Sequence, residues 1–438
     1  MPAREAVAPS AAPGRPLEGT RTLDNRPRPA TPPPTDACSP WVQLRSGSIH
    51  PFIYRKMVRQ ADPAAMPGDL VNVYDKYGNF FGRGLYNPRS QIVVRMLAHN
   101  DVAIDEEFWH SRLLQAVELR RRLNLDQTTD AYRLVHAEGD GLSGLIVERY
   151  ADCLVFELFS LGMYRRQAEL SATLVKILGP PTCLDRPDRA APAWRTIVRA
   201  DQRVEQLEGF RLSDDAASAE AEPPARVTIR EHGLRYRVDV QQGQKTGFFC
   251  DQRDNRRRFG ELCRDATVLD LCCYTGGFSL CASKLGGARE VIGVDLDEAS
   301  IAVARENANL NQTRVDFVHS DAFVYMRQML ANKRQFDAVV LDPPKLAINR
   351  TDYEDAIRKY SDLNHLAVSL VRPGGILLTC SCSGLVQPAA FAETVRQAAN
   401  RSGRTLQMFE QSAAGPDHPV LMNCPESAYL KALWFRVL

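Results

Sequence analysis

Short apolar runs alternate with amphipathic stretches through the C-terminal half of the chain, and this alternation constrains the fold more than any other feature. The runs 267–271, 290–295, 315–321, 336–342 and 374–381 are strand-like, whereas 278–286, 297–311, 322–333, 358–371 and 388–403 have helical spacing. Continuous apolar strands separated by helices are typical of a parallel sheet covered on both faces. We therefore expect an α/β fold with a doubly wound, Rossmann-like sheet.

The N-terminal half has a different texture. Between Trp41 and His99, short apolar runs are broken by Gly, Asn and Pro turn signals, which predicts a small β-barrel. Helical spacing predicts a helix over 104–123, and the strand-rich stretch 131–210 includes a predicted hairpin that turns near 150–152. We expect a disordered proline-rich arm (1–40), a β-barrel domain (41–118), a central β-rich domain ending in a linker at 212–225 (119–225), and the α/β domain (226–438).

Composition limits the class of protein. No apolar run approaches the roughly 18 residues of a membrane-spanning helix, and the first 40 residues lack the apolar core of a signal peptide. Eleven cysteines lie irregularly along the chain without a CxxC pair, which argues against a disulfide framework and against a zinc site. We expect a soluble cytoplasmic protein with reduced thiols, no structural metal and no membrane partner.

Acidic residues end four of the predicted strands. These are Asp270, Asp295, Asp321 and Asp342. Ligands of a doubly wound sheet bind at the carboxyl ends of its strands, although any single Asp there is more often a helix cap than a ligand contact. The glycines of the first loop, "CCYTGGF", lack the GxGxxG spacing that a dinucleotide pyrophosphate requires. Four carboxylates suit a cationic ligand that carries adenosine, and S-adenosylmethionine (SAM) is such a ligand.

Several motifs together carry a family resemblance. "VLDLCCYTGGFSL", "VIGVDLDEASIAVARENANLN", "FDAVVLDPPK", "GGILLTCSCSGLV" and the earlier "GQKTGFFCDQR" look like successive motifs of class I methyltransferases. From residue 41 to the end, the chain resembles the bacterial 23S ribosomal RNA cytosine-5 methyltransferases. The resemblance implies an N-terminal PUA-like domain, a central β-rich domain and a C-terminal methyltransferase domain. The stretch 417–438 also looks like the C-terminal strand pair of that family.

The resemblance also implies a set of site residues. Methylation at carbon 5 of cytosine needs a thiolate that first adds to carbon 6. Since the motif "DPPK" holds Lys345 and no cysteine, the nucleophile is expected in "TCSCSG", where Cys382 matches the family position and Cys380 is the second choice. Asp342 is expected to bind the base and Lys345 to assist the thiolate. The expected cofactor-binding residues are Asp270, Tyr274, Thr275, Gly276, Gly277, Asp295, Asp321, Asp342 and Arg253.

The N-terminal segment is basic. Residues 41–100 contain eight Lys or Arg against three Asp, a local charge of +5, while the whole chain carries +2. Lysine and arginine neutralise phosphates, so this charge favours RNA as the partner. The expected RNA-binding residues are Lys245, Arg55, Lys56, Arg59, Arg83 and Arg89. With large-subunit ribosomal RNA as the implied substrate, the oligomeric state stays open, a homodimer being one option.

Two other functions compete with the cytosine-5 reaction. DPP-type motifs also serve methyltransferases that act on guanine nitrogens, and these need no covalent nucleophile. A ribosome-assembly factor could use the same fold only to bind RNA. Every position expected to carry chemistry is occupied in this sequence, which favours an enzyme over the assembly factor.

Overall fold

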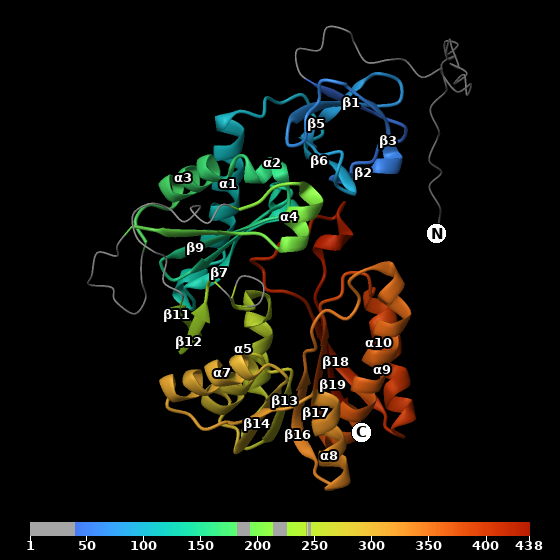
Figure 1. The fold of residues 1–438 in the computed structure, drawn as a ribbon. Helices are drawn as coiled ribbons and strands as arrows, with labels where there is room; N and C mark the ends of the chain where they lie inside the picture. Colours follow the sequence, from blue (N-terminus) through green and yellow to red (C-terminus); the bar gives the residue numbers. More distant parts are fainter. Residues whose placement is uncertain (1–39, 182–192, 213–225, 242, 244–246) are drawn as a thin grey trace, which may run out of the picture.

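The described residues form three sheets and one separate hairpin, arranged as three stacked parts (Figure 1). The computed structural model describes residues 40–181, 193–212, 226–241, 243 and 247–438. The proline-rich arm and the predicted linker lie outside the described residues, except for Pro40 and Leu212. No helix in the described ranges is long and apolar enough to cross a membrane.

A six-stranded sheet forms the N-terminal part. Its strand order is β2-β6-β5-β4-β1-β3, and it encloses its own apolar core, which includes Val42, Ile53, Val73 and Val94. Alternating short apolar runs favoured this all-β unit, and the structure confirms it. The strands are β1 (Trp41–Leu44), β2 (Phe52–Tyr54), β3 (Val58–Ala61), β4 (Leu70–Tyr74), β5 (Phe80–Tyr86) and β6 (Ile92–Ala98), with a 3-10 turn, η1 (Arg55–Met57), after β2.

The central part packs a four-stranded sheet against helices. The strand order is β10-β9-β8-β7, and the predicted hairpin turns at Ala151 and Asp152, between β8 and β9. The predicted helix over 104–123 is α1 (Glu106–Arg122), capped by the Asp105 side chain. The remaining elements are β7 (Ala131–His136), β8 (Leu145–Tyr150), β9 (Cys153–Leu158), α2 (Leu161–Tyr164), α3 (Gln167–Leu178), β10 (Arg195–Arg199) and α4 (Gln202–Glu208).

A hairpin joins the central part to the C-terminal part. Its strands are β11 (Arg226–Glu231) and β12 (Leu234–Asp239), paired in antiparallel register. Ile229 and Tyr236 share one core with Tyr150 of the central sheet and with Ile301 of the C-terminal part. Apolar burial therefore makes the contact between the two parts continuous, which stabilises their relative placement.

The C-terminal part is a seven-stranded sheet with the order β15-β14-β13-β16-β17-β19-β18. Its first five strands along the chain are parallel, and the order reverses between β13 and β16, as expected for a doubly wound sheet. The strands are β13 (Thr267–Leu271), β14 (Glu290–Asp295), β15 (Asp316–His319), β16 (Phe336–Leu341), β17 (Val371–Ser381), β18 (Leu406–Ser412) and β19 (Lys431–Val437).

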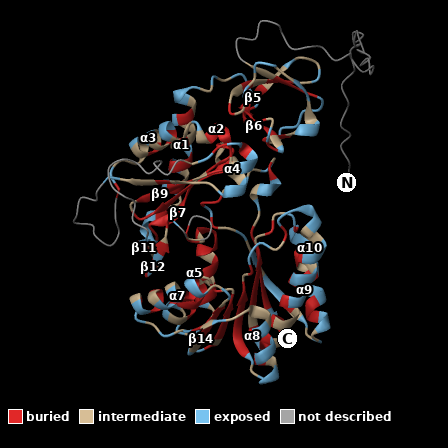
Figure 2. Cartoon of the chain, in the orientation of Figure 1, coloured by how far each residue is buried: buried red, intermediate tan, exposed pale blue. Residues whose placement is uncertain are grey.

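Helices cover both faces of this sheet, and its central strands are buried, whereas the edge strand β18 is mostly exposed (Figure 2). Side chains alternate: Leu269 and Leu271 pack with Met326 of one helical layer, whereas Val268 packs with Phe259 and Phe278 of the other. The helices are α5 (Arg253–Glu261), α6 (Gly277–Leu280) continued by a π-helical turn (Cys281–Leu285), α7 (Glu298–Leu310), α8 (Ala322–Ala331), α9 (Tyr353–Leu370) and α10 (Pro388–Arg401).

Only one strand of the predicted C-terminal strand pair lies within the predicted residues. Within 417–438 the structure has one strand, β19, and its partner β18 precedes this stretch. The residues between them, 413–430, form what we call the connecting segment, which leaves the sheet and runs up towards the N-terminal part (Figure 1). Its three prolines, Pro416, Pro419 and Pro425, cannot donate to a sheet ladder, and a single 3-10 turn, η7 (Pro425–Ser427), interrupts it.

A buried ion pair holds the connecting segment in place. Asp417 is fully buried and accepts hydrogen bonds from Arg253 Nη2 at 2.8 Å and Nη1 at 3.2 Å. The same carboxylate accepts the Arg133 backbone N–H at 2.9 Å, and Arg120 donates to the Asp417 carbonyl at 2.6 Å. One residue thus links helix α5, strand β7 and helix α1.

Asp417→Ala is expected to destabilise the protein strongly. The substitution leaves the buried Arg253 guanidinium without its carboxylate, and breaking a buried ion pair in this way costs about 3–5 kcal/mol. The measurement is the midpoint of urea unfolding. Asp362→Ala is the control, because its pair with Arg401 is about half exposed and should leave the midpoint unchanged. Equal midpoints for the two variants would contradict the assignment.

Candidate active site

The Asp270 side chain holds the loop that follows β13 in place. This side chain is fully buried, and its Oδ2 accepts from the Ser279 backbone N–H at 2.9 Å and from the Ser279 hydroxyl at 2.6 Å. Burial raises the pKa of Asp270 to about 7, although the Ser279 hydrogen bonds act in the opposite direction. Asp270 therefore shapes the loop, because the backbone of helix α6 is tied to it.

Glycine is required at the tip of this loop. Gly276 has a φ of +85°, and a Cβ there would lie 2.8 Å from the Phe317 ring. The Thr275 carbonyl accepts from Asn307 at 3.1 Å, while a Cβ on Gly277 would lie 2.6 Å from Cδ of Arg256. The loop is consequently packed on three sides and rigid, which is what a preformed ligand site needs.

Asp295 at the end of β14 organises the other side of the loop. Its Oδ2 accepts from the Tyr274 backbone N–H at 2.8 Å, and its Oδ1 accepts from Asp297 N–H at 2.9 Å. The Tyr274 hydroxyl donates to the Gly247 carbonyl at 3.2 Å. Each carboxylate oxygen keeps a second lone pair, so Asp295 can still accept from a ribose diol.

The four strand-end acids converge on one place. Burial raises the pKa of the Cys272 thiol, and the charges of four carboxylates raise it further. These four are Asp270, Asp295, Asp321 and Asp342. Asp321 also caps helix α8 by accepting from Val324 N–H at 3.0 Å, so it serves both as a helix cap and as part of this acidic edge.

The acidic edge fits a cationic ligand that carries adenosine. Asp270 Oδ1 is buried without a hydrogen-bond partner among the described residues, and burial of such an atom is costly unless something binds it. Leu296 follows Asp295 and is 66% exposed, and Val324 follows Asp321 and is 59% exposed. An apolar purine could cover these side chains, while the carboxylates attract the charged groups.

Asp342 directly follows strand β16. Gln252, which directly precedes helix α5, holds the Asp342 side chain. Gln252 Nε2 donates to Asp342 Oδ2 at 2.9 Å, and Asn255 in turn donates to Gln252 Oε1 at 2.6 Å. Sequence reasoning overlooked Gln252, although it belongs to the quoted motif "GQKTGFFCDQR". The neighbouring Asp251 is buried and accepts from the Tyr429 hydroxyl at 2.6 Å.

Cys382 and Cys380 differ in their surroundings. Cys380 is fully buried within β17, and burial followed by the charge of Asp342 raises its pKa well above the ordinary value. Cys382 comes just after the strand and is only partly buried. A substrate can therefore reach Cys382, whereas Cys380 belongs to the core, and this contrast supports the first choice of nucleophile.

The two serines beside Cys382 build its frame. Ser381 donates to the Tyr360 hydroxyl at 3.0 Å. Ser383 Oγ accepts from the backbone N–H groups of Leu346 and Ala347, at 3.2 and 3.1 Å. Because Leu346 follows the DPPK motif, the Ser383 hydroxyl draws the loop that begins at Asp342 against the loop that carries Cys382.

Some predicted residues lie elsewhere. The structure does not bring Arg253 to the cleft: it is 1% exposed and its guanidinium is bound to Asp417, so it serves the fold. Desolvation opposes its charge, yet Asp417 raises the pKa of Arg253 overall. Lys345 is exposed beside the Cys382 loop, and Lys245 lies outside the described residues.

The predicted RNA-binding residues differ in their exposure and in the contacts that they already make within the protein. Arg55, Lys56 and Arg59 are exposed on η1 and β3, although Arg55 donates to the Pro88 carbonyl. Arg83 is largely occupied by Asn72 Oδ1 at 3.1 Å and by an ion pair with Asp101. Arg89 is exposed and packs against Gly209 at the end of α4. Lys56 and Arg59 are thus the best placed to meet phosphates.

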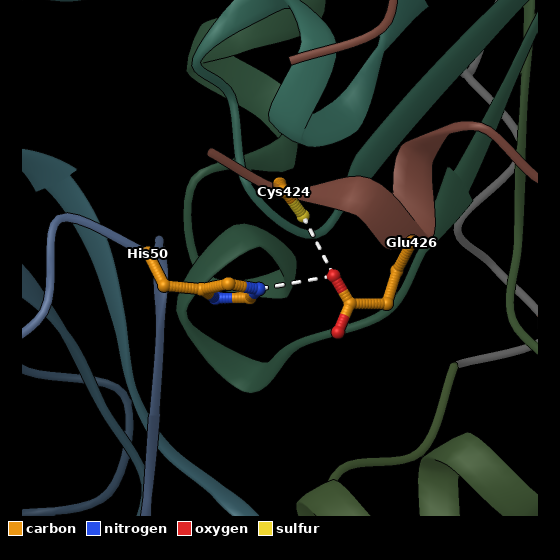
Figure 3. A group of neighbouring side chains, drawn as sticks. All are labelled: His50, Cys424 and Glu426. Carbon is orange, nitrogen blue, oxygen red and sulfur yellow. Dashed lines mark hydrogen bonds and ion pairs between the residues drawn. The ribbon is translucent and has the colours of Figure 1, made fainter. Parts of the chain in front are cut away.

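One cluster resembles a metal site but does not fit one. His50, Cys424 and Glu426 place three potential ligand atoms within 4.8 Å of one another, between the N-terminal sheet and the connecting segment (Figure 3). His50 Nδ1 accepts from Phe52 N–H at 3.0 Å, so in the neutral ring Nε2 carries the proton and donates to Glu426 at 3.0 Å. A metal on Nε2 would need that proton on Nδ1. The cluster is therefore a hydrogen-bonded contact.

Comparison with known proteins agrees with this geometry. Residues 182–436 match the family of S-adenosylmethionine-dependent methyltransferases, and residues 44–99 match a PUA-like domain. The chain is similar in fold to a structure from Streptococcus mutans assigned as a SAM-dependent methyltransferase, with a TM-score of 0.74 and 20% identity over 90% of this chain and all (100%) of that one. The structure of SMU.776 in complex with SAH gives a TM-score of 0.73, with 19% identity over 90% of this chain and 99% of that one.

Two curated relatives are similar over most of their length. Ribosomal RNA large subunit methyltransferase I of Enterobacter sp. (strain 638) is 36% identical over 393 residues, which cover 89% of this chain and 96% of that protein. The protein of the same name from Salmonella arizonae is 37% identical over 394 residues, covering 89% and 94% respectively. The chain therefore belongs to the S-adenosylmethionine-dependent methyltransferase family, in the group that includes these two ribosomal RNA large subunit methyltransferases I.

Proposed function

We propose that this protein methylates carbon 5 of a cytosine in large-subunit ribosomal RNA, with Cys382 as the covalent nucleophile. The observation that carries the proposal is the position of Cys382. It is accessible at the end of β17, and Ser383 ties its loop to the loop of Asp342 at the edge where the four carboxylates meet. The relatives named above act on large-subunit ribosomal RNA.

The side chains divide the chemistry between them. The Cys382 thiolate adds to carbon 6 of cytosine, which makes carbon 5 nucleophilic. Asp342, held by Gln252, accepts hydrogen bonds from the base and stabilises its altered charge distribution. SAM supplies the methyl group when it is bound. Loss of the carbon 5 proton then lets the Cys382 sulfur leave, and the aromatic ring is restored.

A pocket beside Cys382 offers room for a neighbouring nucleotide. It has a volume of about 520 Å³, and Gly384 and Leu385 of the Cys382 loop line it together with Arg350, Tyr353 and Glu426. Arg350 can neutralise a phosphate, and the Tyr353 ring can stack on a base. We propose that RNA passes from the basic N-terminal sheet over this pocket to Cys382. Because ribosomal subunits are assembled in the bacterial cytoplasm, we propose that location for the enzyme.

Cys382→Ala is expected to abolish methylation, by more than about 10³-fold, because it removes the nucleophile. It should also abolish the covalent complex that RNA containing 5-fluorocytidine traps, since fluorine at carbon 5 cannot leave as a proton does. Cys380→Ala is the control and should still form that complex, which gel electrophoresis under denaturing conditions detects. Normal turnover by Cys382→Ala would favour guanine N-methylation, whereas RNA binding by the unaltered protein with neither methylation nor a trapped complex would favour an RNA-binding role without catalysis.

Asp295→Ala should weaken SAM binding roughly ten- to a hundredfold, because hydrogen bonds to a charged group contribute about 1.5–3 kcal/mol. Isothermal titration calorimetry without RNA measures the dissociation constant. Asp316→Ala is the matched control, because this exposed carboxylate begins β15 at the opposite edge of the sheet. An unchanged dissociation constant for Asp295→Ala would remove this residue from the cofactor site.

Lys56→Ala and Arg59→Ala are each expected to weaken RNA binding and to lower the slope of log K against log salt by about one, as expected when one phosphate contact is lost. Fluorescence anisotropy with an rRNA fragment at several salt concentrations gives this slope. Arg264→Ala, an exposed residue at the amino edge of β13, serves as the control. If all three variants behave alike, RNA does not bind at η1 and β3.

A further inference from the structure

A buried lysine begins strand β19. Lys431 is 3% exposed, although a lysine is rarely buried unless it is paired. Among the residues that the structure describes, no carboxylate lies within ion-pairing distance of its Nζ. The ammonium instead donates to two neutral acceptors, the Ser383 carbonyl at 2.7 Å and the Tyr429 carbonyl at 2.9 Å. A charge held in this way has a third donor position and an incompletely compensated desolvation cost.

The topology brings Lys431 to the nucleophile. Because β19 runs antiparallel to β17, the start of β19 lies at the edge where β17 ends, and Lys431 is paired in register with Ser381. Its side chain then reaches the carbonyl of Ser383. The lysine thus contacts the residues on both sides of Cys382, from a position 49 residues later in the chain.

Electrostatics agree with this geometry. Burial lowers the pKa of Lys431 to about 8; Cys382 acts to raise it and Lys345 to lower it. An attraction between two groups is reciprocal, so an ammonium that a thiolate stabilises also stabilises that thiolate. Among the described residues, Tyr360 and Cys380 also interact with Cys382, and burial and nearby negative charge raise the pKa of each.

We propose that Lys431 is a positioning residue for Cys382: it fixes the Ser383 carbonyl and places a buried positive charge beside the thiolate that attacks the base. The inference rests on the proposed function, since it assigns a partner to the same nucleophile. The charge favours the thiolate before it adds to carbon 6 and again when the sulfur leaves. Lys345, which we expected in this role, is exposed, and water screens its charge more strongly.

The ionisation of Cys382 tests this proposal without RNA and without SAM. The full-length protein is treated with iodoacetamide between pH 6 and pH 10, and mass spectrometry follows alkylation of the Cys382 peptide. In Lys431→Gln, which keeps a donor for the Ser383 carbonyl but loses the charge, Cys382 is expected to react about tenfold more slowly at pH 7, because its pKa rises by about one unit. Lys431→Arg should restore most of the rate.

Matched variants separate charge from structure. Lys345→Gln removes an exposed positive charge near the same loop and should change the rate at pH 7 much less than Lys431→Gln. The proposal is overturned if the Lys431→Gln profile coincides with that of the unaltered protein, or if Lys431→Arg is as slow as Lys431→Gln. Thermal melting verifies that each variant is folded, and Lys431→Met replaces Lys431→Gln if the glutamine variant is not. The proposed function fails separately, through normal methylation by Cys382→Ala.

Discussion

The buried contact between Asp417 and Arg253 is the constraint on which the rest of the structure depends. A carboxylate and a guanidinium that are both removed from water must compensate each other, so the connecting segment cannot leave helix α5. Asp417 also accepts from the backbone of Arg133, which fixes the central part against the C-terminal part. Tyr429, at the end of the connecting segment, binds Asp251, so strand β19 begins in a defined place.

This anchoring decides which side chains surround the nucleophile. Gln252 precedes the first strand of the sheet along the chain. Asp342 and Cys382 directly follow strands β16 and β17, and Lys431 begins the antiparallel strand β19. Each reaches the same edge by a different route. The apolar sheet and helices beneath this edge lower the local dielectric, so that the charges of the site act on one another more strongly than they would in water.

The N-terminal sheet is attached through an apolar core, in which Leu85 and Leu97 pack with Trp109 of the central part, and through polar contacts. Glu208 is buried at the end of α4 and accepts from Asn87 Nδ2 at 2.8 Å, while His50 donates to Glu426 of the connecting segment. Hydrogen bonds of this kind fix orientation because they are directional. The orientation of the exposed basic residues of η1 and β3 relative to the Cys382 loop and the pocket beside it is therefore fixed.

The sequence by itself determined the five parallel strands of the C-terminal sheet, the helices between them and the acids at the strand ends, because these depend on local periodicity, and the family resemblance suggested Cys382 as the nucleophile. Only the tertiary structure decided which side chains contact one another. Arg253 carries a motif-like signature, but whether a buried guanidinium meets a ligand or a carboxylate depends on Asp417, 164 residues away. Lys431 escaped detection for the same reason: a lone lysine has no periodicity, and only the antiparallel pairing of β19 with β17 brings it beside Cys382.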